Sequence, residues 1–160
     1  MNEKTPLCPI CEQSHLEAAT HTGNLDHSEQ TLEVPGLEFW KCSSCGADPV
    51  YPDQARRNHR RFQDARRKAD GLLTGAEIAS IRRRHGLTQS EAAKIFGGGT
   101  NAFSKYERGD VIQSVAMDRL LRLASADAAA LRRLQQLAGV ENAQTRISSP
   151  AIGLHAGTND

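Results

Sequence analysis

Four cysteines arranged as two C-x-x-C pairs carry the clearest chemical signal in this sequence. Cys8 and Cys11 form one pair, and Cys42 and Cys45 form the other. Two residues between cysteines allow both thiolates to approach one ion from a tight turn, and two such pairs complete a tetrahedral site. The sequence therefore predicts one structural Zn²⁺ ion per chain, held by four thiolates, with no coordination position open for water.

Other uses of these cysteines are disfavoured by their context. Two disulfides are the main alternative, and the reducing cytosol disfavours them. A redox-active C-x-x-C is a second alternative, but two pairs occur and no βαβ pattern accompanies them. Three histidines between the pairs could compete as ligands, although histidines on polar segments are usually plain surface residues: His15, His21 and His27.

The segment between the two pairs must hold structure of its own, because its thirty residues exceed the usual short spacing. Residues 31–42, TLEVPGLEFWKC, predict two strand segments around a turn at Pro35-Gly36. Residues 15–24 are a weaker strand candidate. We therefore expect a small, β-rich zinc-binding domain over residues 1–50.

The charge of the chain is divided between its segments, although the net charge of the 160 residues is only +1. Residues 1–50 contain two basic and eight acidic residues, whereas residues 51–124 contain fifteen basic and eight acidic ones. Bound zinc with four thiolates makes the first segment still more acidic. A basic middle segment suits nucleic acid, and an acidic first third suits a basic protein partner.

Residues 51–71 predict a basic helical linker that ends at Asp70-Gly71. Residues 52–69 contain seven basic and two acidic residues and few apolar ones. Two interpretations stay open for this helix. It is either a solvated linker, or its cations, Arg61 among them, contact DNA phosphates beside a DNA-binding domain.

A compact all-α domain is expected over residues 72–138. Two T-x-x-E capping boxes, Thr74 to Glu77 and Thr88 to Glu91, begin the first two helices. A third helix is expected over about residues 100–107, Ser114 can cap a fourth, and a fifth is expected over about 126–138. Residues 139–160 show little periodicity and are expected to form a mostly disordered tail.

Three consecutive glycines, residues 97–99, separate the second and third expected helices. Each glycine inside a helix costs about 0.5–1 kcal/mol relative to alanine, so the triplet marks a turn. Two short helices joined by a tight turn predict a helix-turn-helix, with Ala92 and Ala93 small enough for a close crossing. Phe103 is expected to face the core, which makes the third helix the recognition helix in a major groove.

The outer side of that third helix carries the predicted DNA contacts. Asn101 and Lys105 are four residues apart and share one face; Asn can pair with adenine, and Lys can reach guanine O6 and N7. Alternatively, Asn101 only caps the helix, Lys105 contacts only phosphate, and Gln89 lies in solvent. Tyr106 is expected in the core or as a backbone clamp. The predicted DNA-binding residues are Asn101, Lys105, Ser104, Gln89, Thr100, Arg108 and Arg61.

These motifs together resemble one known family. Residues 87–109, LTQSEAAKIFGGGTNAFSKYERG, closely resemble the C-terminal, Xre/Cro-class helix-turn-helix domain of MqsA-type (YgiT-like) antitoxins. CPIC at residues 8–11 and VPGLEFWKCSSCG at residues 34–46 resemble the zinc-binding N-terminal domain of the same family. The resemblance covers roughly residues 6–124, and the order of the two domains also matches.

The resemblance implies a function for each domain. It implies that the N-terminal domain holds structural zinc and binds a toxin, typically a ribonuclease that cuts messenger RNA. It also implies that the C-terminal domain dimerises, binds a palindrome in its own promoter and reads bases through Asn101 and Lys105. Better-known members carry Arg at the second position, and Lys cannot form the same bidentate fork, so base recognition is expected to differ or weaken here.

We therefore expect an α+β protein: a β-rich zinc domain followed by an all-α, lambda-repressor-like domain. The expected function is that of a homodimeric autorepressor and antitoxin that neutralises a small basic toxin. The alternative is a stand-alone zinc-containing Xre-family regulator without a toxin. No nucleophile–base pair, P-loop or open metal site indicates an enzyme. No membrane-length apolar run or signal peptide occurs, so a cytoplasmic location is expected.

Overall fold

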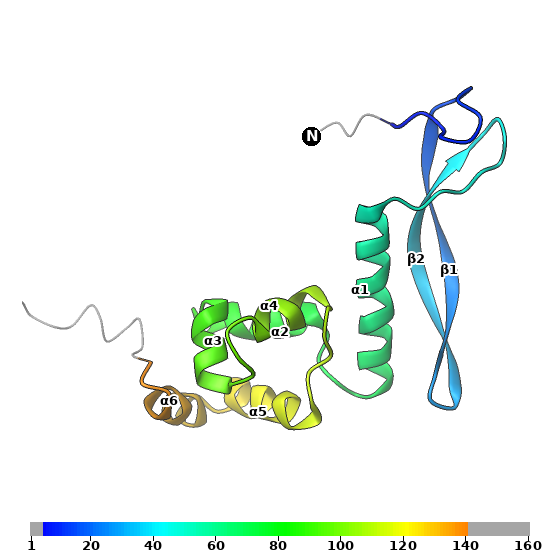
Figure 1. Cartoon of the computed structure of the whole chain (residues 1–160). Helices are drawn as coiled ribbons and strands as arrows, with labels where there is room; N and C mark the ends of the chain where they lie inside the picture. Colours follow the sequence, from blue (N-terminus) through cyan, green and yellow to red (C-terminus); the bar gives the residue numbers. More distant parts are fainter. Residues whose placement is uncertain (1–4, 141–160) are drawn as a thin grey trace, which may run out of the picture.

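The computed structural model describes residues 5–140, and the chain has the expected α+β layout. A two-stranded sheet comes first and a series of helices follows (Figure 1). The strands are β1 (Leu16–His27) and β2 (Gln30–Cys42), and the helices are α1 (Pro52–Ala69), α2 (Gly75–Arg84), α3 (Gln89–Phe96), α4 (Ala102–Arg108), α5 (Val115–Ala126) and α6 (Ala128–Leu137). The expected disordered tail lies almost wholly in residues 141–160, outside the described residues.

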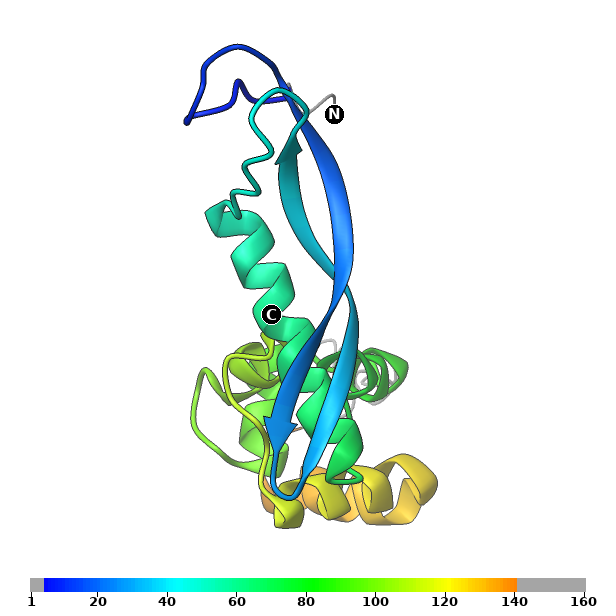
Figure 2. The same ribbon diagram turned by 90° about the vertical axis from the view of Figure 1, so that its right-hand side faces the viewer.

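The hairpin and the helices α2–α6 lie on opposite sides of α1 in Figure 1. The hairpin is long and twisted, and α1 runs beside it in both views (Figures 1 and 2). The loops that carry the cysteines lie at the end of the hairpin farthest from the helices α2–α6. Any metal centre in these loops is therefore separated from the helical part by the length of α1.

The hairpin corrects the expected turn at Pro35-Gly36. The antiparallel pairing runs from Leu16↔Cys42 to His27↔Gln30, so the chain reverses at residues 28–29. Pro35 and Gly36 lie inside the single strand β2, where the register is irregular, and Gly36 has φ +73°. A β-bulge tolerates both a missing proline N–H and a left-handed glycine, which is why this pair resembles a turn in the sequence. The weaker candidate at residues 15–24 is confirmed as part of β1.

The expected basic helix is present as α1, and its contact with β2 orders it against the sheet. The side chain of Asn58 brackets one residue of the β2 backbone: the Glu38 N–H donates to its Oδ1 at 2.7 Å, and its Nδ2 donates to the Glu38 carbonyl at 2.8 Å. The Glu38 carboxylate also pairs with Arg57 at 2.7 Å and Arg61 at 3.2 Å. These contacts satisfy polar groups on the strand edge that faces α1.

Local capping signals define the helical part as expected. The hydroxyl of Thr74 accepts the Glu77 N–H, and the Glu77 carboxylate accepts the Thr74 N–H at 2.7 Å, which begins α2. Thr88 and Glu91 form the same reciprocal pair before α3. The Ser114 hydroxyl caps α5 by accepting the Met117 N–H at 3.2 Å. α4 begins at Ala102, two residues later than expected, because Asn101, with φ −104° and ψ 7°, lies outside the helical conformation and precedes the first helical residue.

Two separate apolar clusters stabilise the chain. The larger lies among the helices, and its most buried members are Ile78, Ala92, Phe103, Leu121 and Ala124, all 0% exposed. The smaller surrounds Cys8, Leu16 and Cys42 at the far end of the hairpin. Among the described residues, no helix combines the length and apolar character needed to cross a membrane.

Candidate metal centre and nucleic-acid interface

All four cysteines converge on one point, as the sequence predicts for a shared ion. Their four Sγ atoms lie within 4.8 Å of one another, and both the Cys8–Cys45 and Cys11–Cys42 separations are 3.7 Å. Tetrahedral Zn–S bonds of about 2.3 Å place sulfur atoms about 3.8 Å apart. The four thiols are free, and 3.7 Å is far beyond the roughly 2 Å of a disulfide. The cluster therefore has the size of a four-thiolate metal site.

The hairpin register brings the two cysteine loops together. Leu16, just after the first loop, pairs with Cys42, the last residue of β2. The first loop is closed by the Cys8 N–H, which donates to the Ser14 carbonyl at 2.9 Å. The second is closed by the Cys42 N–H, which donates to the Ala47 carbonyl at 2.8 Å. Each C-x-x-C pair thus sits on a hydrogen-bonded turn at one end of the sheet.

Hydrogen bonds at this site favour a thiolate on Cys42. The Ser14 hydroxyl lies 3.2 Å from the Cys42 Sγ and, with the Cys45 N–H, lowers the pKa of Cys42 to about 6 against a smaller opposing effect of burial. At Cys45, the Ala47 N–H lowers the pKa, but the neighbouring cysteines, Cys42 first, outweigh it and raise the pKa to about 12. Four thiolates this close repel one another, and a bound cation would remove that repulsion.

The three histidines between the cysteine pairs make other contacts. The His15 Nδ1 lies 2.9 Å from the Thr5 carbonyl, and the His21 ring packs edge-on against Phe39. The His27 Nε2 lies 2.7 Å from the Asp70 carboxylate, which joins the hairpin tip to the end of α1. Within residues 5–140, the only cluster of possible metal ligands is made of the four cysteines.

The glycine triplet between α3 and α4 adopts a backbone that suits glycine alone. Gly97, Gly98 and Gly99 have φ values of +86°, +93° and +88°. A Cβ atom on Gly98 would lie 2.9 Å from the Cβ of Ala102, closer than real side chains approach. The triplet therefore permits the sharp turn that sets α4 across α3.

α4 has one buried side and one exposed side. Phe103 is 0% exposed and packs against the rings of Phe96 and Tyr106. Asn101 and Lys105 are exposed, and within the described part of the chain neither side chain forms a hydrogen bond or ion pair. Asn101 lies at the cap position, but its side chain makes no capping hydrogen bond, which contradicts the interpretation of Asn101 as a side-chain cap.

The other predicted DNA contacts divide into two groups. Thr100 is exposed just before α4, and Ser104 accepts a hydrogen bond from the exposed Arg108, which also pairs with Asp110 at 2.7 Å. Gln89 and Arg61 are instead bound to residues of other helices or strands. The Gln89 Nε2 donates to the Glu107 carboxylate at 2.9 Å, and Arg61 pairs with Glu38 on β2. DNA contacts by all these residues stay predictions.

Glu107 joins three helices through a network that the sequence analysis did not identify. Its carboxylate accepts hydrogen bonds from Arg82 on α2 and Gln89 on α3, each at 2.9 Å. Burial raises the pKa of Glu107, but the hydrogen bonds from Arg82 and Gln89 outweigh burial and lower it overall. The network fixes the end of α4 relative to the two preceding helices. Residues 18 and 25 positions apart in sequence give no local signal of such pairing.

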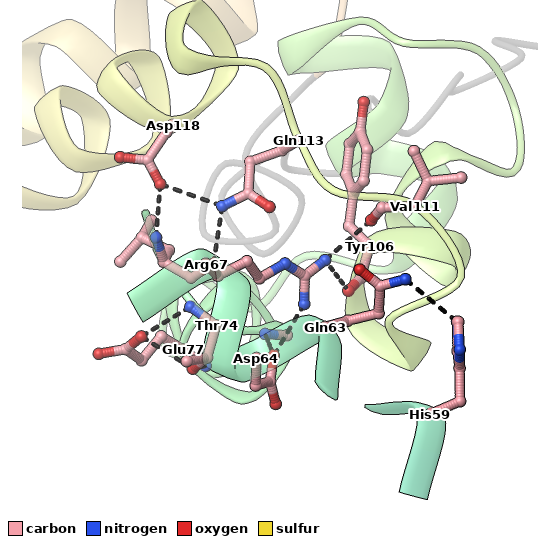
Figure 3. Close-up of polar contacts among 12 residues, drawn as sticks. His59, Gln63, Asp64, Arg67, Thr74, Glu77, Tyr106, Val111, Gln113 and Asp118 are labelled. Carbon is pink, nitrogen blue, oxygen red and sulfur yellow. Dashed lines mark hydrogen bonds and ion pairs between the residues drawn. The ribbon is translucent and has the colours of Figure 1, made fainter. Parts of the chain in front are cut away.

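Arg67 is the second feature that the sequence analysis missed. It is 0% exposed, although it lies in a helix expected to be a linker. Its guanidinium donates to the carbonyls of Tyr106 and Val111, both at 2.8 Å, and to Asp64 at 3.0 Å (Figure 3). Asp64 also accepts the N–H of Gly75 at the start of α2. The i, i+3 spacing of Asp64 and Arg67 was the only available sequence signal, and it predicts a surface pair rather than a buried one.

Comparison with known proteins identifies a family that matches most of this chain. Residues 7–134 match the family described as the antitoxin component of bacterial toxin-antitoxin systems, MqsA. The chain is also similar to the antitoxin MqsA of Escherichia coli (strain K12), with 26% identity over 117 residues. That similarity spans 72% of this chain and 89% of the relative. The chain therefore belongs to the MqsA family of antitoxins, the antitoxin components of bacterial toxin-antitoxin systems.

Proposed function

We propose that this antitoxin is a homodimeric, sequence-specific DNA-binding protein in which α3 and α4 form a helix-turn-helix. The observation that carries the proposal is the two-sided character of α4. Phe103 anchors one side in the core, whereas Asn101 and Lys105 on the outer side lack partners among residues 5–140. Buried polar groups need partners, but exposed side chains with free donors and acceptors are available to a ligand.

We infer that α4 enters a major groove and that Asn101 and Lys105 contact base edges. An Asn amide can bond both N6 and N7 of adenine, and a Lys ammonium can reach O6 and N7 of guanine. Thr100, Ser104 and Arg108 flank these two residues and are proposed to contact the adjacent backbone or bases. Because Lys105 is a point charge rather than a planar fork, we expect weaker discrimination at its base than an Arg would give.

We propose that the hairpin with its cysteine loops binds the toxin and holds one Zn²⁺ ion. The donor set supports zinc, because four thiolates in a tetrahedral arrangement are typical of structural zinc sites. Exposed acidic side chains along the hairpin support a basic partner, such as a small ribonuclease-type toxin: Glu17, Asp26, Glu29 and Glu33. The proposed role is regulatory and non-enzymatic, and the ion would be structural because no ligand position stays open.

The DNA-binding proposal is tested by the specificity of the Asn101→Ala variant. The zinc-loaded full chain is titrated against a fluorescent duplex from its own promoter and against a scrambled duplex of the same composition. Loss of a bidentate base contact costs about 1–3 kcal/mol, so binding to the promoter should weaken roughly 5- to 150-fold. Binding to the scrambled duplex should not change. An unchanged ratio between the two duplexes would exclude Asn101 from base reading.

A matched control and a partner experiment complete the test. Arg132→Ala removes an exposed cation from α6, remote in sequence from the proposed reading residues, and should leave the specificity ratio unchanged. The antitoxin is also purified from its native host and examined by native mass spectrometry. A complex with zinc and a small basic protein supports the toxin proposal. A zinc-loaded homodimer alone contradicts it and favours a regulator without a toxin.

A further inference from the structure

A hollow of about 380 Å³ lies where α1, α2 and α4 meet. Three arginines from three different helices line it: Arg60, Arg83 and Arg108. Its other walls include the small residues Gly75 and Gly109. The backbone of α1 closely approaches the end of α4, because a Cβ on Gly109 would lie 3.5 Å from the Cα of Arg60.

The acidic groups beside this hollow are already neutralised by other cations. Asp64 accepts hydrogen bonds from the buried Arg67 and from a backbone N–H of α2. Glu107 is paired with Arg82 and accepts a further hydrogen bond from Gln89. The lining therefore keeps an excess of positive charge, and a ligand with negative charge would meet little repulsion.

Two of the three arginines are available for such a ligand. Arg60 and Arg83 are exposed, and within residues 5–140 neither forms a hydrogen bond or ion pair. Arg108 is held by Asp110, at 2.7 Å, and by the hydroxyl of Ser104, which fixes its position at the rim. Guanidinium groups suit phosphate in particular, because their N–H groups can donate two parallel hydrogen bonds to its oxygens.

The place of the hollow relative to α4 indicates which phosphate it could receive. The seven steps from Asn101 to Arg108 span about 10 Å along a helix that rises about 1.5 Å per residue. The major groove is about 12 Å wide. If α4 crosses the groove with Asn101 on the base edges, its Arg108 end reaches the phosphate backbone that borders the groove. The hollow is located at this end of α4.

We infer that this hollow is a binding site for a DNA backbone phosphate, with Arg60 and Arg83 as its main ligands. The inference rests on the proposed DNA-binding function and deepens it, because it makes α1 part of the DNA interface. A phosphate held by α1, α2 and α4 together fixes the angle at which α4 enters the groove. This phosphate contact increases affinity and fixes the position of the protein along the duplex, and it adds no base preference of its own.

The test is the salt dependence of DNA binding by the double variant R60Q/R83Q. The zinc-loaded full chain is titrated against the promoter duplex and the scrambled duplex at several NaCl concentrations. Each phosphate contact contributes about 0.9 to the slope of log K against log salt. We expect the slope to become shallower by about 0.9 for each hollow that binds a phosphate. Both duplexes should bind more weakly, and the ratio of the affinities for the promoter and the scrambled duplex should not change.

The control variant Arg56→Gln removes one charge from an exposed position of the same helix, where Arg56 pairs with Asp53 outside the hollow. It should leave the slope as in the wild type. A wild-type slope for R60Q/R83Q overturns the phosphate site, and so does an equal reduction by Arg56→Gln. Loss of toxin binding without loss of DNA binding in R60Q/R83Q overturns it as well.

Failure of the inference can be distinguished from failure of the proposed function. If the wild type prefers its promoter and Asn101→Ala loses that preference, DNA reading by α4 stands whatever R60Q/R83Q does. If the wild type binds both duplexes equally, the proposed function fails and the phosphate site fails with it. Far-ultraviolet circular dichroism of each variant confirms that exposed substitutions have left the fold intact.

Discussion

Arg67 provides the sharpest prediction about stability, because a buried guanidinium joins α1 to α2–α6. Replacing it with Met leaves the carbonyls of Tyr106 and Val111 and the Asp64 carboxylate without this donor. Removing one member of a buried charged group costs about 3–5 kcal/mol, so Arg67→Met should lower the free energy of unfolding by that amount. Arg67→Lys keeps the charge but cannot reach all three acceptors, and should lose about 1.5–3 kcal/mol.

Guanidinium denaturation of the zinc-loaded protein measures this effect with two probes. The single tryptophan, Trp40, lies on β2 and reports the hairpin, whereas circular dichroism at 222 nm reports mainly the helices. Arg56→Met is the control, because its exposed pair with Asp53 should contribute less than about 1 kcal/mol. In Arg67→Met we expect the helical signal to be lost at lower denaturant. A loss below about 1 kcal/mol would refute the structural role assigned to Arg67.

Three further predictions concern acid stability, the glycine turn and the metal centre. Although burial raises the pKa of Glu107, hydrogen bonds from Arg82 and Gln89 outweigh burial and lower that pKa below its ordinary value of 4.5. The stabilising effect of the Glu107 carboxylate is therefore complete above pH 4.5. Thermal unfolding should therefore show Glu107→Gln less stable than the wild type at neutral pH. The stability difference between the two proteins should shrink as the pH falls below 4.5 and through the folded-state pKa. A stability difference that does not change with pH would contradict this. Gly98→Ala should cost about 1–3 kcal/mol in chemical denaturation, more than Gly99→Ala, because both have positive φ but only Gly98 also lacks space for a Cβ. Elemental analysis should find about one zinc per chain in the wild type and much less in Cys42→Ser, whereas equal zinc contents would exclude the shared site.

The candidate site was predictable from sequence wherever a few adjacent residues determine the chemistry. Two C-x-x-C pairs specified a four-cysteine cluster, and the structure places the four sulfur atoms together. The exposed position of Asn101 and Lys105 followed from helical spacing once Phe103 was assigned to the core. Gln89 illustrates the limit of this reasoning. Its amide bonds Glu107, a partner 18 residues away that no local pattern indicates.

The sequence alone determined the boundaries of most helices and the turn between α3 and α4. Capping boxes and glycine conformations act through hydrogen bonds and backbone sterics within about four residues, so the chain carries them locally. It also determined which cysteines form the cluster, because each C-x-x-C pair is a local unit. For the same reason, the prediction of a turn at Pro35-Gly36 was wrong, because the local chemistry of this pair suits a turn and a β-bulge equally.

Only the tertiary structure decided how α1 is used. The sequence of α1 is that of a solvated basic helix, and whether its cations face water, β2 or the helices depends on segments far along the chain. Arg67 is buried because two carbonyls 39 and 44 positions later offer it acceptors. Arg61 faces β2 because Glu38 lies there. Arg60 and Arg83 line one hollow, and Asp64 on α1 accepts the Gly75 N–H at the start of α2 beside it. Long-range pairing of this kind depends on chain topology rather than on local propensity, which is why sequence patterns do not reveal it.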